Sequence, residues 1–228
     1  MSQDLLWLAL SWLAYFAIHS LLAGLSLKDW LARRHPGLMP YYRLGYNVLA
    51  ILLLAGPLYL TFQPEAAPLW QWVAPWRWLG DGLAIAAMVG FVYSLMFYDG
   101  AVFLGLRQWR TRSSQVEEVG DLRISPLHRY VRHPWYSLAL VVMWTRDMDV
   151  LLLLSCGLIS LYFALGSRLE ERKLETIYGD VYRDYCREVP GLLPRPWRRL
   201  TAQQAAELEQ RGRQSIGEMQ KDAPRGGG

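Results

Sequence analysis

The sequence predicts an all-α integral membrane protein of about five transmembrane segments, the last two forming a short helical hairpin, followed by a helical C-terminal region in the cytoplasm. Three observations predict this fold class. Hydrophobic residues make up 53% of the 228 residues, with 11 Trp and 13 Tyr among the aromatic ones. Long apolar runs alternate with basic stretches, so that the mean hydropathy is only +0.08. Lys and Arg are concentrated in alternate loops between these runs.

Three segments carry enough apolar residues to cross a bilayer, whose hydrocarbon core requires about 20 residues of helix. They are Leu5–Leu25, Leu44–Phe62 and Trp78–Tyr98. The first begins after Asp4 and has neither a basic start nor a small-residue cleavage site. We therefore expect a retained helix and not a signal peptide.

A shorter apolar stretch, Pro134–Thr145, precedes a polar turn at residues 146–149 and a nearly full-length apolar stretch, Val150–Ser167. Together these stretches predict the helical hairpin. Periodicity does not distinguish a hairpin that crosses a thinned bilayer from a re-entrant pair. In both cases the chain returns to the side from which it came.

The distribution of Lys and Arg predicts the orientation. The first and third loops are basic, with Lys28, Arg33, Arg34 and Arg43 in the first and Arg107, Arg110, Arg112, Arg123, Arg129 and Arg132 in the third. Arg77 and Arg146 stand alone in the other two loops. The positive-inside rule then predicts that the N-terminus lies outside and that the chain from Arg168 onward lies in the cytoplasm.

We expect one domain over residues 1–196, with its functional region at residues 120–196. Residues 197–228 form a polar tail, in which Thr201–Gln220 has the composition of a surface helix and Asp222–Gly228 has no means to pack. Two cysteines in different surroundings, Cys156 and Cys186, predict no disulfide framework. The four histidines are scattered, so we expect no metal site, and no nucleic-acid-binding motif is present.

The first chemically informative motif runs from Arg132 to Tyr136, where a basic loop becomes an apolar helix. Pro134 suits the first helical turn, because its missing N–H would have no partner there. The free N–H groups of a helix start favour an anionic group, and Arg132 adds a permanent positive charge. The motif therefore predicts a pocket for a carboxylate, and anchoring at the membrane interface is the alternative.

The second motif, from Arg168 to Arg172, follows the last apolar run. At 3.6 residues per turn one helical face carries Arg168, Glu171, Arg172 and Glu175. Acidic residues near a helix C-terminus and near membrane depth need a cationic partner. A ligand with an ammonium and a sulfonium group would supply that partner, and a salt-bridged helix end is the alternative.

The third motif places Tyr178, Tyr182 and Tyr185 on one helical face. These side chains are suited to form an aromatic wall over a flat ring such as adenine, with hydroxyl groups that can form hydrogen bonds. An amphipathic helix packed against lipid headgroups is the alternative.

Together and in this order, the three motifs resemble the isoprenylcysteine carboxyl methyltransferase and phospholipid methyltransferase superfamily of integral membrane enzymes. The resemblance covers residues 120–196. The matching residues are Arg132, His133, Pro134 and Tyr136 for the Arg-His-Pro-x-Tyr motif, Glu170 and Glu171 for the Glu-Glu pair, and Tyr178, Gly179, Tyr182 and Tyr185 for the aromatic motif. The chain departs from the family at Leu138, where a glycine is frequent.

The resemblance implies S-adenosylmethionine as cofactor and no metal. It implies that the cofactor contacts are His133, Pro134, Tyr136, Glu171, Tyr182 and Tyr185. Among the catalytic candidates Arg132, Arg168 and Glu170, the hypothesis is that one arginine stabilises a thiolate.

Segments 103–108 and 144–148, with His19 in the first apolar run, most resemble the methanethiol S-methyltransferase branch. This branch implies a small thiol as acceptor, with a lipid-like acceptor as the alternative, membrane lipids as surroundings and the bacterial inner membrane as location. Two other functions stay open: a membrane NADPH-dependent reductase of similar architecture, and a non-catalytic accessory membrane protein of nitrogen-oxide respiration. The sequence predicts no oligomeric state.

Overall fold

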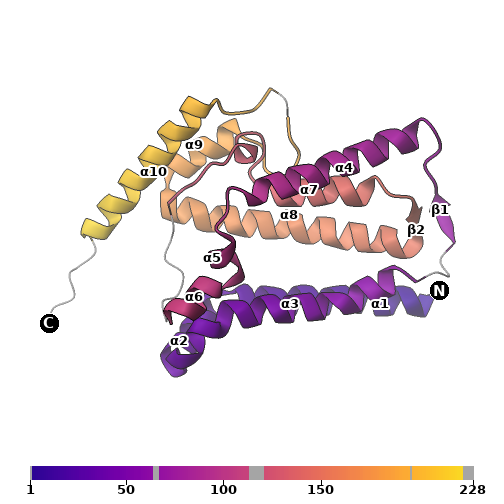
Figure 1. Cartoon of the computed structure of the whole chain (residues 1–228), viewed down its shortest axis with the longest axis horizontal. Helices are drawn as coiled ribbons and strands as arrows, with labels where there is room; N and C mark the ends of the chain where they lie inside the picture. Colours follow the sequence, from indigo (N-terminus) through magenta and orange to yellow (C-terminus); the bar gives the residue numbers. More distant parts are fainter. Residues whose placement is uncertain (1, 64–66, 113–120, 196, 223–228) are drawn as a thin grey trace. The chain divides into compact units, whose positions relative to one another are not determined.

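The computed structural model describes residues 2–63, 67–112, 121–195 and 197–222, which form helices and two short strands (Figure 1). The chain divides into two compact units. The first unit consists of residues 1–118 and 141–162, and the second of residues 119–140 and 163–228. Two helices, α7 (Pro134–Trp144) and α8 (Val150–Tyr178), contribute to both units. The expected domain over residues 1–196 stays a prediction.

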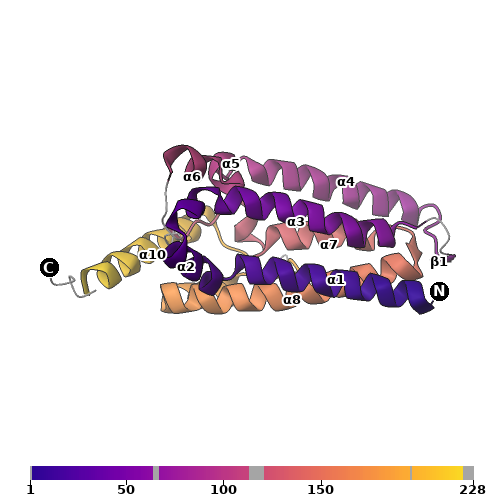
Figure 2. The ribbon, with the colours of Figure 1, turned by 90° about the horizontal axis from the view of Figure 1, so that it is seen from below.

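The first unit contains the predicted apolar helices. Its elements before residue 112 are α1 (Ser2–Ala23), α2 (Leu25–Arg34), the 3-10 turn η1 (Pro36–Leu38), α3 (Met39–Thr61), β1 (Pro68–Trp70), α4 (Trp76–Leu95), α5 (Gly100–Leu104) and α6 (Leu106–Thr111). α1 and α3 lie side by side (Figures 1 and 2). Among the described residues, four helical stretches are long and apolar enough to cross a membrane: residues 3–23, 36–61, 76–95 and 150–178. The prediction of an all-α membrane protein is confirmed.

Polar side chains join the apolar helices of the first unit. The Trp12 indole donates a hydrogen bond to Ser155 Oγ (2.9 Å), which is also 2.7 Å from Thr61 Oγ1. His19 Nε2 lies 2.7 Å from the Tyr46 hydroxyl, and its Nδ1 lies 3.0 Å from the Tyr162 hydroxyl. Such bonds hold helices together where lipid removes the hydrophobic driving force. His19 thus contacts α3 and α8.

The predicted hairpin consists of α7, the strand β2 (Met148–Asp149) and α8. Asp149 accepts hydrogen bonds from the first amides of α8, those of Leu151 and Leu152, both at 2.8 Å. β2 pairs antiparallel with β1, so the tip of the hairpin reaches the connection between α3 and α4. α7 has 11 residues, about 16 Å of helix, which is too short to cross a bilayer alone. The number of spans therefore stays a prediction.

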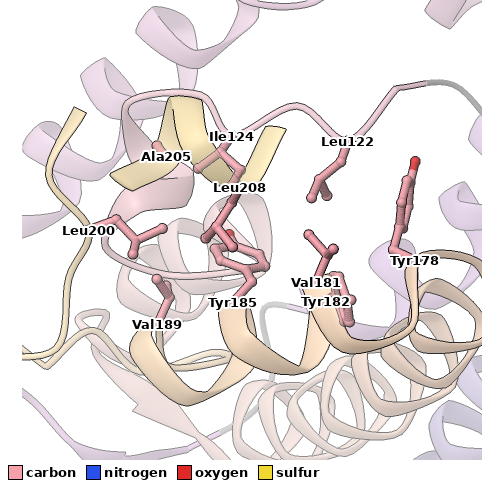
Figure 3. Packing of buried hydrophobic residues seen from close by; sticks show 10 residues of the cluster. All are labelled: Leu122, Ile124, Tyr178, Val181, Tyr182, Tyr185, Val189, Leu200, Ala205 and Leu208. Atoms are coloured by element: carbon pink, nitrogen blue, oxygen red, sulfur yellow. The ribbon is translucent and has the colours of Figure 1, made fainter. Parts of the chain in front are cut away.

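The second unit is built around a hydrophobic cluster. Helix α9 (Asp180–Glu188) follows α8 at Gly179, whose φ of 57° is readily adopted only by glycine. The other elements are the 3-10 turn η2 (Leu127–Arg129) and α10 (Ala202–Asp222). The cluster consists of Leu122, Ile124, Tyr178, Val181, Tyr182, Tyr185, Val189, Leu200, Ala205 and Leu208 (Figure 3).

Helix α10 corresponds to the surface helix expected over Thr201–Gln220, and it is attached to the rest of the second unit. Its buried residues include Ala205 and Leu208, and Glu209 Oε1 accepts a hydrogen bond from the Ile124 amide (2.6 Å). The expectation for residues 223–228 lies outside the described residues.

Candidate functional site

A charged cavity opens in the second unit, beside the motifs identified in the sequence. It has a volume of about 270 Å³ and is lined by Arg132, Arg168, Glu171, Arg172, Glu175, Tyr182 and Cys186. All four residues predicted to share one face of α8 are in this lining. The period of 3.6 residues therefore predicted this wall of the cavity correctly.

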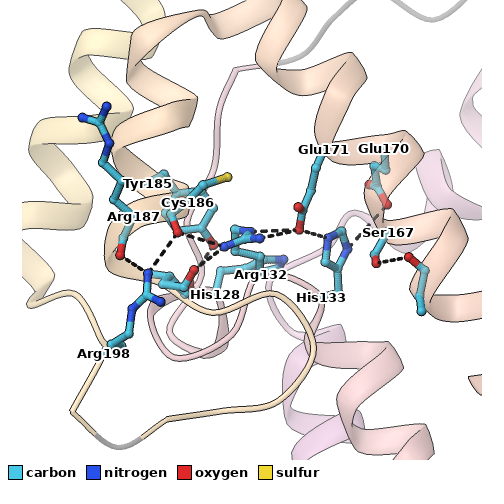
Figure 4. A network of polar contacts seen from close by, with 12 residues as sticks. His128, Arg132, His133, Ser167, Glu170, Glu171, Tyr185, Cys186, Arg187 and Arg198 are labelled. Carbon is cyan, nitrogen blue, oxygen red and sulfur yellow. Dashed lines mark hydrogen bonds and ion pairs between the residues drawn. The ribbon is translucent and has the colours of Figure 1, made fainter.

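Glu171 is the most constrained carboxylate of the site (Figure 4). Its Oε1 accepts hydrogen bonds from Arg132 Nε (2.9 Å) and His133 Nε2 (2.8 Å), and it lies 2.8 Å from Arg132 Nη2. Within the described part of the chain, the hydrogen bonds and ion pairs of this carboxylate all use Oε1. The second oxygen, Oε2, therefore keeps its acceptor capacity for a ligand.

Arg132 is engaged through its whole guanidinium group. Besides Glu171, it donates through Nη1 to the carbonyl oxygens of Cys186 (3.2 Å) and Val189. Its side chain is only 12% exposed. Arg132 thus connects α8 to the end of α9, and it has little remaining capacity to bind a substrate.

His133 is held between two glutamates and a stack of rings. Its side chain is 7% exposed, and its Nδ1 lies 3.6 Å from Glu170 Oε2. The ring stacks on Tyr136 with 5.6 Å between centroids, and Tyr136 stacks on Phe163 at 4.4 Å. The residues His133, Pro134, Tyr136 and Glu170 lie beside the cavity wall and are not in its lining.

The segment Val189–Leu192, which we call the strap, fixes the first motif through its backbone. Its four consecutive carbonyl oxygens accept hydrogen bonds from Arg132 Nη1, Arg132 N (2.9 Å), His133 N (3.1 Å) and Ser137 Oγ (2.5 Å). A Cβ added at Gly191 would lie 3.3 Å from Arg132 Nη2 and 3.5 Å from Glu171 Oε1. A larger residue there would press on this ion pair. Pro134 is the first residue of α7, as predicted.

Of the three tyrosines predicted to form an aromatic wall, only Tyr182 lines the cavity. It is 2% exposed, and burial raises the pKa of its hydroxyl, so that it stays neutral. Tyr185 donates its hydroxyl to the His128 carbonyl (2.7 Å) and belongs, like Tyr178, to the hydrophobic cluster. The three tyrosines therefore belong mainly to the hydrophobic core, and Tyr182 is the one that also lines the cavity.

Three lining residues were not among the sequence candidates: Arg172, Glu175 and Cys186. Arg172 lies one turn after Arg168, and within the described ranges neither arginine has an ion pair. Glu175 is 3.4 Å from Arg183. Burial raises the pKa of the Cys186 thiol, which makes it a poor nucleophile. The helical period had placed the first two on the face of Arg168 and Glu171, although neither was named as a site residue, whereas Cys186 depends on how α9 packs.

The chain is similar in sequence to several characterised proteins. It is 32% identical to methanethiol S-methyltransferase of a Pseudomonas species over 190 residues, covering 79% of this chain and 70% of that protein. It is 32% identical to methanethiol S-methyltransferase 2 of Bradyrhizobium diazoefficiens over 80% of this chain and 71% of that protein. For methanethiol S-methyltransferase of Mycobacterium tuberculosis the identity is 32%, over 82% of this chain and 77% of that protein. No family model and no solved structure matches the chain.

Proposed function

Because the chain belongs to the family of the methanethiol S-methyltransferases, we propose that it transfers a methyl group from S-adenosylmethionine to a small thiol in the cavity beside Glu171. The chain is a membrane methyltransferase that acts on a thiol. The observation that carries the assignment to this cavity is the geometry of Glu171. Its carboxylate is fixed through one oxygen and open through the other.

The residues of the cavity fit a cofactor that carries an ammonium, a carboxylate and a flat ring. Glu171 Oε2 would accept hydrogen bonds from the ammonium group, because Oε1 is already occupied. Arg172 would bind the carboxylate, since it lines the cavity without an ion pair in the described part of the chain. Tyr182 offers an aromatic surface to the ring. When bound, the cofactor supplies an activated methyl group on a sulfonium sulfur.

The protein's part in such a transfer is to hold donor and acceptor in line and to keep water out. The cysteine thiol has a pKa near 8.5, and a thiol acceptor must lose its proton before it attacks. A neighbouring guanidinium favours the thiolate. Of the two arginines predicted for this role, Arg132 is engaged by Glu171 and two carbonyl groups, so Arg168 is the better candidate.

The remaining predicted residues would act through others. Glu170 faces His133 Nδ1, and His133 in turn fixes Glu171, so both would be positioning residues. Tyr136 supports His133 by stacking, and Tyr185 supports the core under Tyr182. Pro134 starts the helix that presents these groups.

The names of the relatives favour methyl transfer over a membrane reductase and over a non-catalytic accessory protein. They also favour a small thiol over a lipid-like acceptor. The basic first and third loops support an N-terminus outside and a cytoplasmic site. The bacterial sources of the relatives support the bacterial inner membrane as location.

The decisive experiment is binding of S-adenosylmethionine to the purified full-length protein, measured by calorimetry in lipid nanodiscs. We expect Glu171→Gln to weaken binding about 10- to 100-fold, because a charged hydrogen bond to the ammonium is lost. The matched control is Glu188→Gln, an exposed acidic residue on α9, which should bind like the unchanged protein.

Two further measurements make the outcome interpretable. Thermal unfolding of Glu171→Gln separates lost binding from lost folding. Formation of dimethyl sulfide from methanethiol and S-adenosylmethionine tests the acceptor directly. Unchanged cofactor affinity in a folded Glu171→Gln protein, or saturable binding of NADPH in place of S-adenosylmethionine, would overturn the proposal.

A further inference from the structure

The chain exposes two large apolar side chains just after the strap. Leu193 is 71% exposed and Trp197 is 78% exposed, both in the second unit. A hydrogen bond from the Arg198 amide to the Arg195 carbonyl (2.9 Å) closes a turn in this loop. The loop ends at Leu200, which is 1% exposed and whose amide donates to the Arg129 carbonyl (3.0 Å). The loop is therefore tied down at its end while its apolar side chains face outward.

Positive charge surrounds these apolar side chains. Between residues 189 and 201 the sequence contains three arginines and no acidic residue. Arg195 and Arg199 are exposed, and the Arg199 guanidinium lies 5.8 Å from the ring centroid of Tyr130, which is itself 40% exposed. Arg198 is held by the carbonyl oxygens of Cys186 and Arg187. Exposed apolar side chains with arginines next to them in the sequence are typical of an interfacial lipid contact.

We propose that this loop forms a docking surface for a bilayer rich in anionic lipids. The surface consists of Leu193, Arg195, Trp197 and Arg199. Trp prefers the headgroup level, and Leu prefers the acyl boundary just below it. Each arginine near an anionic surface contributes about 1 kcal/mol of attraction. The second unit is continuous with α8, a candidate membrane span, so a bilayer is always available as partner. The docking surface does not depend on which acceptor the enzyme methylates.

Limited proteolysis of the full-length protein tests this surface. Trypsin cleaves after Arg198 and Arg199 in the loop and after Arg213, an exposed residue of α10 that serves as the internal control. The protein is placed in nanodiscs of phosphatidylcholine alone or with about one third phosphatidylglycerol, and the fragments are quantified by mass spectrometry. We expect cleavage in the loop to be at least fivefold slower in the anionic discs, with less than a twofold change after Arg213.

The double variant Leu193→Ser/Trp197→Ser and the single variant Arg195→Gln should each reduce this lipid dependence. Cleavage of the variants after Arg213 at the rate of the unchanged protein shows that their second unit is folded. Equal loop cleavage in both kinds of disc would overturn the proposal, and so would equal slowing at the loop and at Arg213. A lipid dependence that both variants retain would also contradict it.

Discussion

Arg132 contacts three separate parts of the second unit: Glu171 on α8, the last turn of α9 and the strap. Nε and Nη2 face Glu171, and Nη1 faces the carbonyl oxygens of Cys186 and Val189. A lysine carries the same charge but cannot donate in these directions at once. The arginine is therefore specified by geometry as well as by charge.

We expect Arg132→Lys to lower the free energy of unfolding by about 2–4 kcal/mol, because it leaves a half-buried carboxylate and two carbonyl groups poorly paired. Denaturant unfolding in detergent measures this. The control is Arg187→Lys, an exposed arginine 3.2 Å from Asp184, which should change stability by less than about 1 kcal/mol. Equal effects of the two substitutions would contradict the role assigned to Arg132.

His128 makes the stability of the second unit depend on pH. Burial, with a smaller effect of nearby His133, lowers the pKa of His128 from 6.5 to about 4. The unfolded chain therefore binds more protons than the folded chain between these two values, so stability is full above pH 6.5 and falls as the pH falls toward 4.

We expect the unchanged protein to lose about 2 kcal/mol of unfolding free energy from this group between pH 7 and pH 4.5. His128→Asn should flatten that part of the profile, whereas His35→Asn, at an exposed position of the first unit, should not. Thermal unfolding across this pH range is the measurement. Parallel profiles for the unchanged protein and His128→Asn would refute the assignment.

At the scale of elements, the sequence predicted the features that depend on residue spacing along a helix. The apolar spans, the start of α7 at Pro134 and the charged face of α8 follow from residue spacing, and the structure contains them. The three motifs also indicated the methyltransferase superfamily, and the relatives confirm that branch.

Contacts between distant segments could not be predicted in the same way. The strap holds the first motif through backbone carbonyl groups, which leave no side-chain pattern in the sequence. The tyrosine face of α9 is amphipathic whether it covers a ligand, a membrane or another helix. Its neighbours, α10 and residues 122–124, decide that Tyr185 is core.

Helix α10 should stabilise the second unit through its buried face. Leu208 is 6% exposed in the hydrophobic cluster, so Leu208→Ala should lower the unfolding free energy by about 2–4 kcal/mol. Gln214→Ala, at an exposed position of the same helix, should have little effect. Thermal unfolding compares the two variants, and equal melting temperatures would show that α10 is not part of the folded core.

At the scale of the whole molecule, α8 carries both a candidate membrane span and residues that line the cavity. Glu171 follows Val150 by 21 residues, about 30 Å along the helix, which equals the thickness of a hydrocarbon core. A span that begins at Val150 therefore brings Glu171 to the opposite interface. The charged face of α8 can then lie in water while its apolar start lies in lipid.

The orientation is testable in cells. We expect an epitope tag before Met1 to be removed by protease added to intact spheroplasts, and a tag after Gly228 to be protected, because the basic loops stay inside. Permeabilised spheroplasts, in which both tags are digested, are the control. Protection of the N-terminal tag with loss of the C-terminal one would reverse the proposed topology.

The strap also limits how this protein can change during evolution. Four carbonyl groups in succession bind fixed partners between Arg132 and Ser137, so inserting or deleting one residue in the strap would shift every bond to the wrong partner. Substitutions that keep the backbone path are tolerated more easily than any change of length. In functional homologues we therefore expect the spacing from the end of α9 through the strap to stay constant even where the side chains differ.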